Sequence, residues 1–416
     1  MLAVAANKLL KGHDFTRQLD PSLRIPESYQ ANVGFEREIG RGFVLEANYT
    51  FNRGLHLWRE FNANAPRLPP GYRDFTDYLL SRDFPNLRDA AGARPLYDAQ
   101  TAGDLVRFTL AQSSASDPDA IGRLVEFGVP VTLVNLNSFN STTALEAALA
   151  ALANLRPDPS RKQVEQLVAA GDSFYHGLTV EARTRLASRA RGFGLSMRAG
   201  YTLSRLVDDG VVNTSSALRV GDFRGERARS LLDRRHRFAL SGTLDAPRRF
   251  GSFRLSTVTR LASGAPFNVS LGGDDRNLDD VGNDRPSYSG DLSLIRWRAP
   301  GSAAADPALL AAFSLPAIGR TGNLPRNAGR GPALFTLDLN LTREFRLTEH
   351  ARLRPAVEID NALNKTVFTY GAEFINFSAL RPDAAPAERQ ALLDSFLAPT
   401  RTLRPRSVRV GLRLDF

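Results

Sequence analysis

Cysteine is absent from the 416 residues, and lysine occurs only at Lys8, Lys11, Lys162 and Lys365. Without cysteine the chain can form neither disulfides nor cysteine-based zinc and iron–sulfur sites. It also lacks any run of the ~18 or more consecutive apolar residues that a transmembrane helix needs, which excludes a helical membrane protein. The length exceeds that of one ordinary small domain, so two domains or a single large barrel would account for it.

Motifs that would carry catalysis or hold a cofactor are also missing. No serine lies in a G-x-S-x-G turn, and no glycine-rich loop matches a phosphate-binding loop. The five histidines do not have metal-ligand spacing; they are His13, His56, His176, His236 and His350. Two of them lie at the ends or on the apolar faces of expected strands, where interface anchoring is the simplest interpretation. We therefore expect no catalytic residues, no cofactor and no metal site, and no enzyme activity.

One acidic loop invites comparison with a calcium site. Asp275, Asn277 and Asp279 occupy every second position, which is the spacing of the first three oxygen ligands in a calcium-binding loop. Asp280 stands where an EF-hand has its turn glycine, and Pro286 stands where it has its bidentate glutamate. The loop is therefore not an EF-hand, and both a calcium-ordered loop and a solvated acidic turn stay open.

Arginine carries most of the positive charge, which gives the chain a formal net charge of +10. A nucleic-acid-binding protein would use such an excess to neutralise phosphates. These arginines, however, are scattered among apolar residues and form neither a stripe nor a tail, which argues against nucleic acid as a partner. Contacts with lipid phosphates, or with carboxylates inside a polar barrel lumen, explain the scattered positions of the arginines better than nucleic-acid binding does.

The strongest pattern present is an alternation of apolar and polar residues with a period of two. From Phe193 to Leu203 every odd-numbered residue is apolar, and the residues between are polar or glycine. Successive side chains of a strand point to opposite faces, so such a segment has one apolar and one polar side. The pattern predicts nine strands, at about 27–38, 43–57, 173–187, 193–206, 234–246, 252–269, 333–347, 351–367 and 404–416.

Short and long connections alternate between these strands. The short links are 39–42, 188–192, 247–251 and 348–350; the long ones are about 58–172, 207–233, 270–332 and 368–403. Bacterial outer-membrane barrels have short periplasmic turns and long extracellular loops. We therefore predict an all-β, antiparallel transmembrane barrel portion over 27–416, with 1–26 as an N-terminal loop remnant.

A soluble β-sandwich is the main structural alternative, because its strands also alternate. It is disfavoured because the predicted strands are long and the long loops lie at one end only. The polar face also carries charges of both signs, which a wet lumen would accept. Alanine- and leucine-rich stretches at 142–155, 160–170 and 384–396 predict short helices within the long loops.

Several motifs resemble, in the same order along the chain, those of large TonB-dependent receptors of the Oar-like type, which often follow a carboxypeptidase-regulatory-like domain. The clearest is Asp233–Phe238 (DRRHRF) at the start of a predicted strand. The others lie at 25–26, 35–38, 44–49, 52–57, 201–204, 263–267, 283–286, 326–332, 337–340, 358–364 and 409–416. The resemblance implies a 22-stranded barrel in the outer membrane, closed by an N-terminal plug that contacts TonB.

The chain departs from that family pattern in the segments that it lacks. The apolar run at residues 1–7 is shorter than a signal-peptide core and has no basic residues before it. We expect neither an export signal nor a plug here, so that TonB would be reached only through a plug absent from this chain. Nine strands leave two edges that lipid cannot satisfy, which predicts a fragment.

The sequence thus predicts the C-terminal barrel portion of a TonB-dependent receptor in the bacterial outer membrane. In the full-length protein it would take part in binding and uptake of an unidentified extracellular ligand, with membrane lipid and lipopolysaccharide as neighbours. A stand-alone structural or adhesion-type outer-membrane barrel, closing as an oligomer, is the alternative. A secreted soluble β-protein is a third hypothesis.

Overall fold

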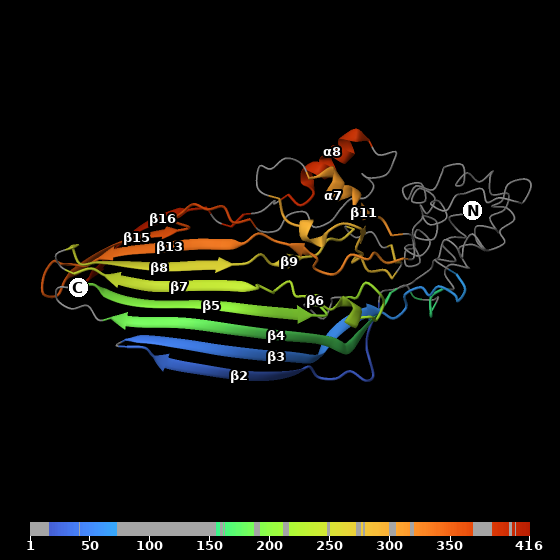
Figure 1. Ribbon diagram of the computed structural model, residues 1–416, viewed down its shortest axis with the longest axis horizontal. Helices are drawn as coiled ribbons and strands as arrows, with labels where there is room; N and C mark the ends of the chain where they lie inside the picture. Colours follow the sequence, from blue (N-terminus) through green and yellow to red (C-terminus); the bar gives the residue numbers. More distant parts are fainter. Residues whose placement is uncertain are drawn as a thin grey trace, which may run out of the picture.

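The computed structural model describes residues 16–72 apart from 41; 155–158, 161 and 163–186; 192–210; 216–298 apart from 248–249, 272–275 and 278; 305–368 apart from 317–319; 385–398; and 402–416 apart from 404. The largest sheet in this part of the chain has 12 strands, and all but one of its strand pairings are antiparallel. Nine of them are long and pair with their neighbours in the sequence, so that the sheet is a meander (Figure 1). They are β2 (Glu27–Glu38), β3 (Phe43–Asn62), β4 (Val164–Leu186), β5 (Gly194–Asp208), β7 (His236–Asp245), β8 (Phe253–Ala262), β13 (Leu334–Arg343), β15 (Arg352–Asp360) and β16 (Ser407–Asp415).

These nine strands confirm the strands predicted from alternation, with differences at several ends. β8 stops at Ala262 rather than near 269, because the chain turns at Ser263 and Gly264 towards the short strand β9 (Pro266–Phe267). β15 stops at Asp360 rather than near 367, because Asn361 adopts a left-handed backbone conformation with φ 48°. The two-residue strand β14 (Phe345–Arg346) continues β13 after a break.

β3 and β4 are much longer than predicted, at 20 and 23 residues. A transmembrane strand needs only ~9–11 residues, so about half of each strand extends beyond that length at the end away from the short turns. Register shifts between Gly54 and Arg59 mark the place where β3 passes from one half to the other. His56 lies within this irregularity and has a left-handed backbone, with φ 55°.

The helix predicted over 160–170 is wrong, because residues from Val164 onwards belong to β4. Their composition favours a helix, but both sides of this segment are paired. Val168 pairs with Arg59 on β3, and Leu167 also pairs with Leu19 on β1 (Thr16–Leu19), which runs parallel to β4. The hydrogen bonds of these two ladders satisfy the backbone N–H and C=O groups of the segment in an extended conformation, and they override its helical propensity.

The long connections carry short elements that gather beyond the ends of β8 and β13 (Figure 1). The helix predicted over 384–396 is confirmed by α8 (Pro386–Ser395), whereas 142–155 lies, but for its last residue, outside the described residues. α7 (Pro307–Ala311) begins after Asp306, whose side chain accepts a hydrogen bond from the Ala308 N–H. The remaining strands are β6 (Ala228–Arg229), β10 (Ser287–Tyr288), β11 (Phe313–Ser314) and β12 (Gly329–Arg330).

The main apolar core lies among these connections and not within the sheet. Phe267, Phe396 and Ile295 are among its largest fully buried side chains. They pack with nine further buried side chains from β10, β11, α7, α8 and the segments between these elements, and this packing fixes the two helices to each other. The nine are Val269, Leu271, Tyr288, Ala305, Leu310, Phe313, Leu324, Leu392 and Leu397. The edge-on contact of Phe313 with Phe396, at 5.6 Å between ring centres, joins the two regions of the chain.

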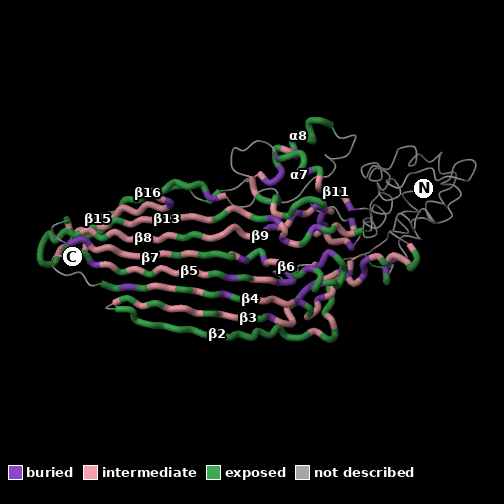
Figure 2. The backbone as a smooth tube through the Cα atoms, viewed as in Figure 1, coloured by how far each residue is buried: buried purple, intermediate pink, exposed green. Residues whose placement is uncertain are grey.

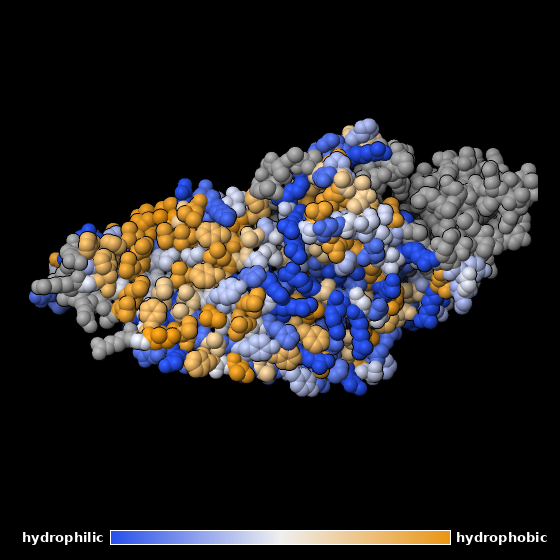
Figure 3. Space-filling model, viewed as in Figure 1, coloured by the Kyte–Doolittle hydropathy of each residue, from blue (hydrophilic) through white to orange (hydrophobic). Residues whose placement is uncertain are grey.

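The two faces of the sheet differ in polarity, as the alternation predicts. Val33, Val410 and Leu412 are 72%, 80% and 70% exposed on the apolar face. Figure 3 shows this face: hydrophobic side chains cover the strands, and hydrophilic ones gather where the strands end near β6 and β9. An apolar side this exposed is typical of a surface that meets lipid or another protein.

The sheet is curved but not closed in the described part of the chain. Its edge strands are β2, which pairs there only with β3, and β16, which pairs there only with β15. Every residue of β2 and nearly every residue of β16 is exposed (Figure 2). None of the helices described is long and apolar enough to cross a membrane.

Candidate functional site

Charged side chains of both signs project from the polar face and pair across neighbouring strands. Arg198 on β5 contacts Glu181 on β4 at 2.7 Å, because the register sets their strands side by side. Three further pairs repeat this arrangement: Arg254–Asp245 at 2.6 Å, Arg260–Asp338 at 3.6 Å and Arg409–Glu358 at 3.1 Å. Arg183 on β4 instead reaches across β3 to Glu36 on β2, at 2.5 Å. The polar face is therefore a charged, largely balanced surface, and these pairs are exposed enough to exchange partners with a solute.

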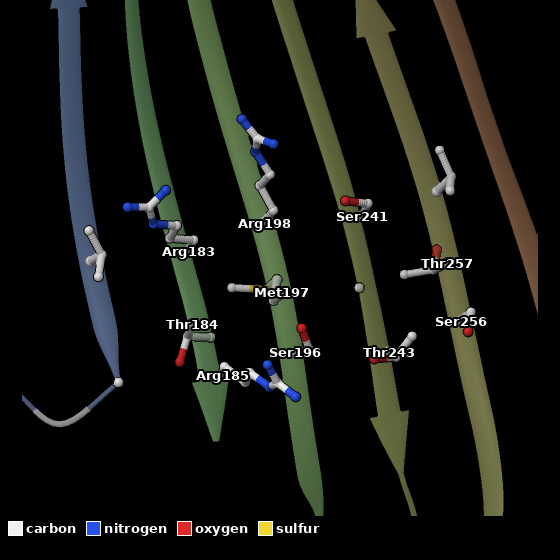
Figure 4. A pocket seen from close by; sticks show the side chains of 14 residues that line it. Arg183, Thr184, Arg185, Ser196, Met197, Arg198, Ser241, Thr243, Ser256 and Thr257 are labelled. Atoms are coloured by element: carbon white, nitrogen blue, oxygen red, sulfur yellow. The ribbon is translucent and has the colours of Figure 1, made fainter. Parts of the chain in front are cut away.

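A broad hollow of ≈ 660 Å³ lies on the sheet at the end near the short turns. Figure 4 shows its side chains, which come from β3, β4, β5, β7 and β8. On the polar face, Arg183, Arg198 and the hydroxyls of Ser241, Thr243 and Ser256 line it. Guanidinium and hydroxyl groups can donate hydrogen bonds to a polar or anionic solute, but this set holds no nucleophile–base pair.

At the opposite end of the strands several charged side chains are buried. Arg285 makes a two-pronged ion pair with Glu226, with N–O distances of 2.7 and 2.8 Å, and both side chains are almost fully buried. Arg326 contacts the Asp208 carboxylate at 2.5 Å. The Arg285–Glu226 pair therefore joins two of the long connections to each other, and the Arg326–Asp208 pair fixes a connection to the end of β5.

Arg59 lies in the same buried region, on the part of β3 beyond its register shifts. Burial lowers the pKa of Arg59, and the carboxylates of Asp208 and Asp209 oppose that shift. Arg227 has the opposite balance: its pKa is raised, chiefly by its hydrogen bond to Asp209. Arg227 also contacts Asp172 at 3.0 Å, so it links β4 with the end of β5. These groups build a rigid polar layer at the strand ends.

The acidic loop is occupied by its own hydrogen bonds where it is described. Asp279 accepts from the backbone N–H of Val281 and from the Asn277 amide, at 2.9 and 3.1 Å. Asp280 instead forms a buried ion pair with Arg156 at 2.7 Å. Asp275 lies outside the described residues, and within them no group of three or more histidine, cysteine or acidic residues could hold a metal ion.

Two histidines join aromatic residues on the apolar face. His176 Nδ1 lies 2.8 Å from the Tyr49 hydroxyl, and His236 Nδ1 lies 2.7 Å from the Tyr201 hydroxyl. Amphipathic rings of this kind are enriched at membrane–water interfaces. Their placement supports the interpretation of these histidines as interface anchors.

Sequence reasoning missed the buried ion pairs, although it noted some of the motifs that contain them. Arg285 lies in 283–286 and Arg326 begins 326–332, but nothing local pairs them with Glu226 and Asp208. The available signal was weak: charged residues directly after strand ends, in connections rich in glycine and proline. Partners separated by about 60 to 120 positions cannot be matched from one sequence.

Comparison with known proteins gives one family match. Residues 4–380 match the model of a family described as outer membrane beta barrel domain. A search of curated proteins finds no match.

Solved structures resemble the chain only distantly. The outer membrane transporter YddB from Escherichia coli is 6% identical, with 97% of this chain and 34% of that chain covered and a TM-score of 0.42. The ferripyoverdine receptor of Pseudomonas aeruginosa is 11% identical (94% and 27% covered, TM-score 0.37). The FrpB iron transporter of Neisseria meningitidis is 9% identical (97% and 33%, TM-score 0.37). The chain spans about a third of their length or less.

Proposed function

Because this chain belongs to the outer membrane beta barrel domain family and so lies in the bacterial outer membrane, we propose that it is the C-terminal barrel portion of an Oar-like TonB-dependent receptor. In the complete receptor it takes part in binding an extracellular ligand and in its uptake. In that receptor a plug domain contacts TonB. The apolar face of the sheet contacts membrane lipid and lipopolysaccharide.

The observation that carries this proposal is the open sheet. In the described part of the chain, β2 and β16 each have one unpaired edge. Lipid offers no hydrogen-bond partner for an edge backbone, so each edge must meet another strand. Further strands of the same receptor would meet this need, and the collinear motifs from 25–26 to 409–416 support a receptor of this type.

The charged polar face supports a role in ligand passage. Its ion pairs can rearrange around a polar solute, and the connections fixed at the strand ends supply the surface that an extracellular ligand meets first. On this proposal, residues 27–416 form the barrel portion, and the connections at about 58–172, 207–233, 270–332 and 368–403 face the outside.

The mass of the native polypeptide tests the proposal. Antibodies against the α8 segment would isolate the protein from outer membranes, and its peptides would be sequenced by mass spectrometry. We expect a polypeptide well above 45.6 kDa that contains plug peptides. A native band at 45.6 kDa without plug peptides would contradict it.

A stand-alone barrel that closes as an oligomer is the second candidate, and the exposed edges favour testing it. Asn32 on β2 and Gly411 on β16 both lie on the polar face near the middle of an edge strand. A variant with cysteine at both positions forms disulfide-linked dimers only where β2 of one copy meets β16 of another. We expect no dimers in native membranes, whereas efficient dimer formation would favour the oligomer.

A further inference from the structure

Five arginines line one cavity at the strand ends remote from the short turns. These residues, named here the outer arginine cluster, are Arg205, Arg229, Arg235, Arg296 and Arg330. They line a cavity of ≈ 570 Å³ together with His236, Ser263, Gly264 and Gly331. Four of the five arginines are exposed, and the fifth, Arg229, is half-buried.

The strand register places two members of this cluster, Arg205 and Arg229, on the apolar face of the sheet. Arg205 follows Leu203 on the apolar face of β5, and Arg229 pairs with Val207 on the same face. His236, opposite Leu203, bonds to Tyr201 and stands between the apolar side chains and the arginines. The cluster therefore begins where the apolar side chains of β5 end.

Closely packed backbone forms the base of the cavity. A Cβ at Gly264 would lie 1.8 Å from the carbonyl oxygen of Gly331, so only glycine allows this contact. Arg296 and Arg330 are joined by a backbone bridge, and the Ser263 hydroxyl accepts a hydrogen bond from the His236 N–H at 3.1 Å. The arginines thus project from a backbone that is fixed in place.

Positive charge in this cluster exceeds the negative charge around it. Arg229 contacts Asp233 at 2.8 Å, and the charges of Arg296 and Arg330 help to lower the pKa of Asp291, after larger effects of hydrogen bonds from Ser293. The cavity itself is lined by no acidic side chain among the described residues. On the polar face, in contrast, Arg183, Arg198, Arg254, Arg260 and Arg409 each contact a carboxylate.

An excess of guanidinium groups at the outer border of an apolar surface matches one chemistry closely. Guanidinium binds phosphate through two parallel hydrogen bonds, and lipid headgroup phosphates lie at this depth. We propose that the outer arginine cluster binds the phosphate groups of a phosphorylated lipid headgroup in the outer leaflet. This inference rests on the membrane orientation given under the proposed function.

Binding of lipopolysaccharide to the full-length protein tests the inference. The protein and an Arg205→Gln/Arg235→Gln variant would be purified from membranes, and their affinities for lipopolysaccharide and dephosphorylated lipopolysaccharide measured. Each arginine near a membrane surface contributes about a factor of five in affinity, so we expect the double variant to bind lipopolysaccharide about thirtyfold more weakly. Affinity for the dephosphorylated lipid should be low for both proteins.

Arg343→Gln is the matched control, because Arg343 also lies on the apolar face but at the end near the short turns. It should leave lipopolysaccharide binding unchanged. Equal binding by wild type and double variant would overturn the inference, as would displacement of the lipid by inorganic phosphate at equal concentration. Heat-modifiable migration of every variant reports barrel formation separately, so a folded barrel without phosphate preference refutes only this inference.

Discussion

At the residue scale, the same kind of ion pair has different consequences at the two ends of the strands. The Arg254–Asp245 pair on the polar face has its guanidinium side chain 61% exposed, so water can replace either partner. The Arg285–Glu226 pair is 7% and 5% exposed, so neither charge can be solvated if the other is lost. Burial, and not charge alone, decides which pair holds the structure together.

Replacing Glu226 tests this difference. Glu226→Gln keeps the shape of the side chain but leaves the Arg285 charge buried without its carboxylate, so we expect a loss of about 3–5 kcal/mol. Asp245→Asn, the control on the polar face, should cost less than about 1 kcal/mol. Urea unfolding of the detergent-solubilised protein measures both, and equal losses would contradict the argument.

Gly42 offers a second prediction at this scale. It has φ +80°, and a Cβ there would lie 3.0 Å from the carbonyl oxygen of Arg185. Gly42→Ala should therefore destabilise the β2–β3 hairpin by about 1–2 kcal/mol. Gly411→Ala, where no atom lies within 4 Å of the added Cβ, should be neutral or slightly stabilising in the same unfolding measurement.

At the scale of elements, each strand separates two environments through its alternation. On β13, Leu339 lies on the apolar face, whereas its neighbour Asn340 lies on the polar face and donates a hydrogen bond to Glu358 at 3.2 Å. The two residues are adjacent in the strand, but their side chains project from opposite faces of the sheet. Adjacent substitutions therefore report the polarity of each side.

An arginine at each of these two positions should have opposite outcomes. Leu339→Arg places a charge towards lipid near the middle of a strand, and we expect a loss of about 2–4 kcal/mol in folding into lipid vesicles. Asn340→Arg can pair with Glu358 and should be tolerated. The measurement is urea-dependent folding of the full-length protein into vesicles, and similar losses at both positions would show that neither face meets lipid.

At the scale of the whole molecule, the short turns and the long connections lie at opposite ends of the sheet (Figure 1). The short links join β2 to β3, β7 to β8 and β13 to β15, whereas the folded connections with α7 and α8 stand at the other end. In an outer-membrane barrel the short turns face the periplasm. The fold thus predicts which end of the molecule is reached from outside the cell.

Cysteine labelling tests this orientation, since the chain has no cysteine of its own. Ser289→Cys, in the connection before α7, should react with a membrane-impermeant maleimide on intact cells. Glu349→Cys, in the exposed turn before β15, should react only after the outer membrane has been permeabilised. Labelling of Glu349→Cys alone on intact cells would show that the barrel has the reverse orientation.

The sequence by itself determined the nine long strands, because each depends on a local alternation such as that from Phe193 to Leu203. It also determined α8, where a run of helix-forming residues follows Pro386. Short motifs that occur in the same order as in TonB-dependent receptors indicated the family resemblance. What these signals share is that neighbouring residues carry them.

Only the tertiary structure decided what depends on distant partners. The segment after Val164 became a strand because β3 and β1 supply its ladders, against its helical composition. Glu226 contacts Arg285 because two long connections fold against each other, and the outer arginine cluster combines residues of β5, β6 and β12 with Arg235 and Arg296 from connecting segments. Cross-strand register and loop packing bring such residues together, and neither leaves a local trace in the sequence.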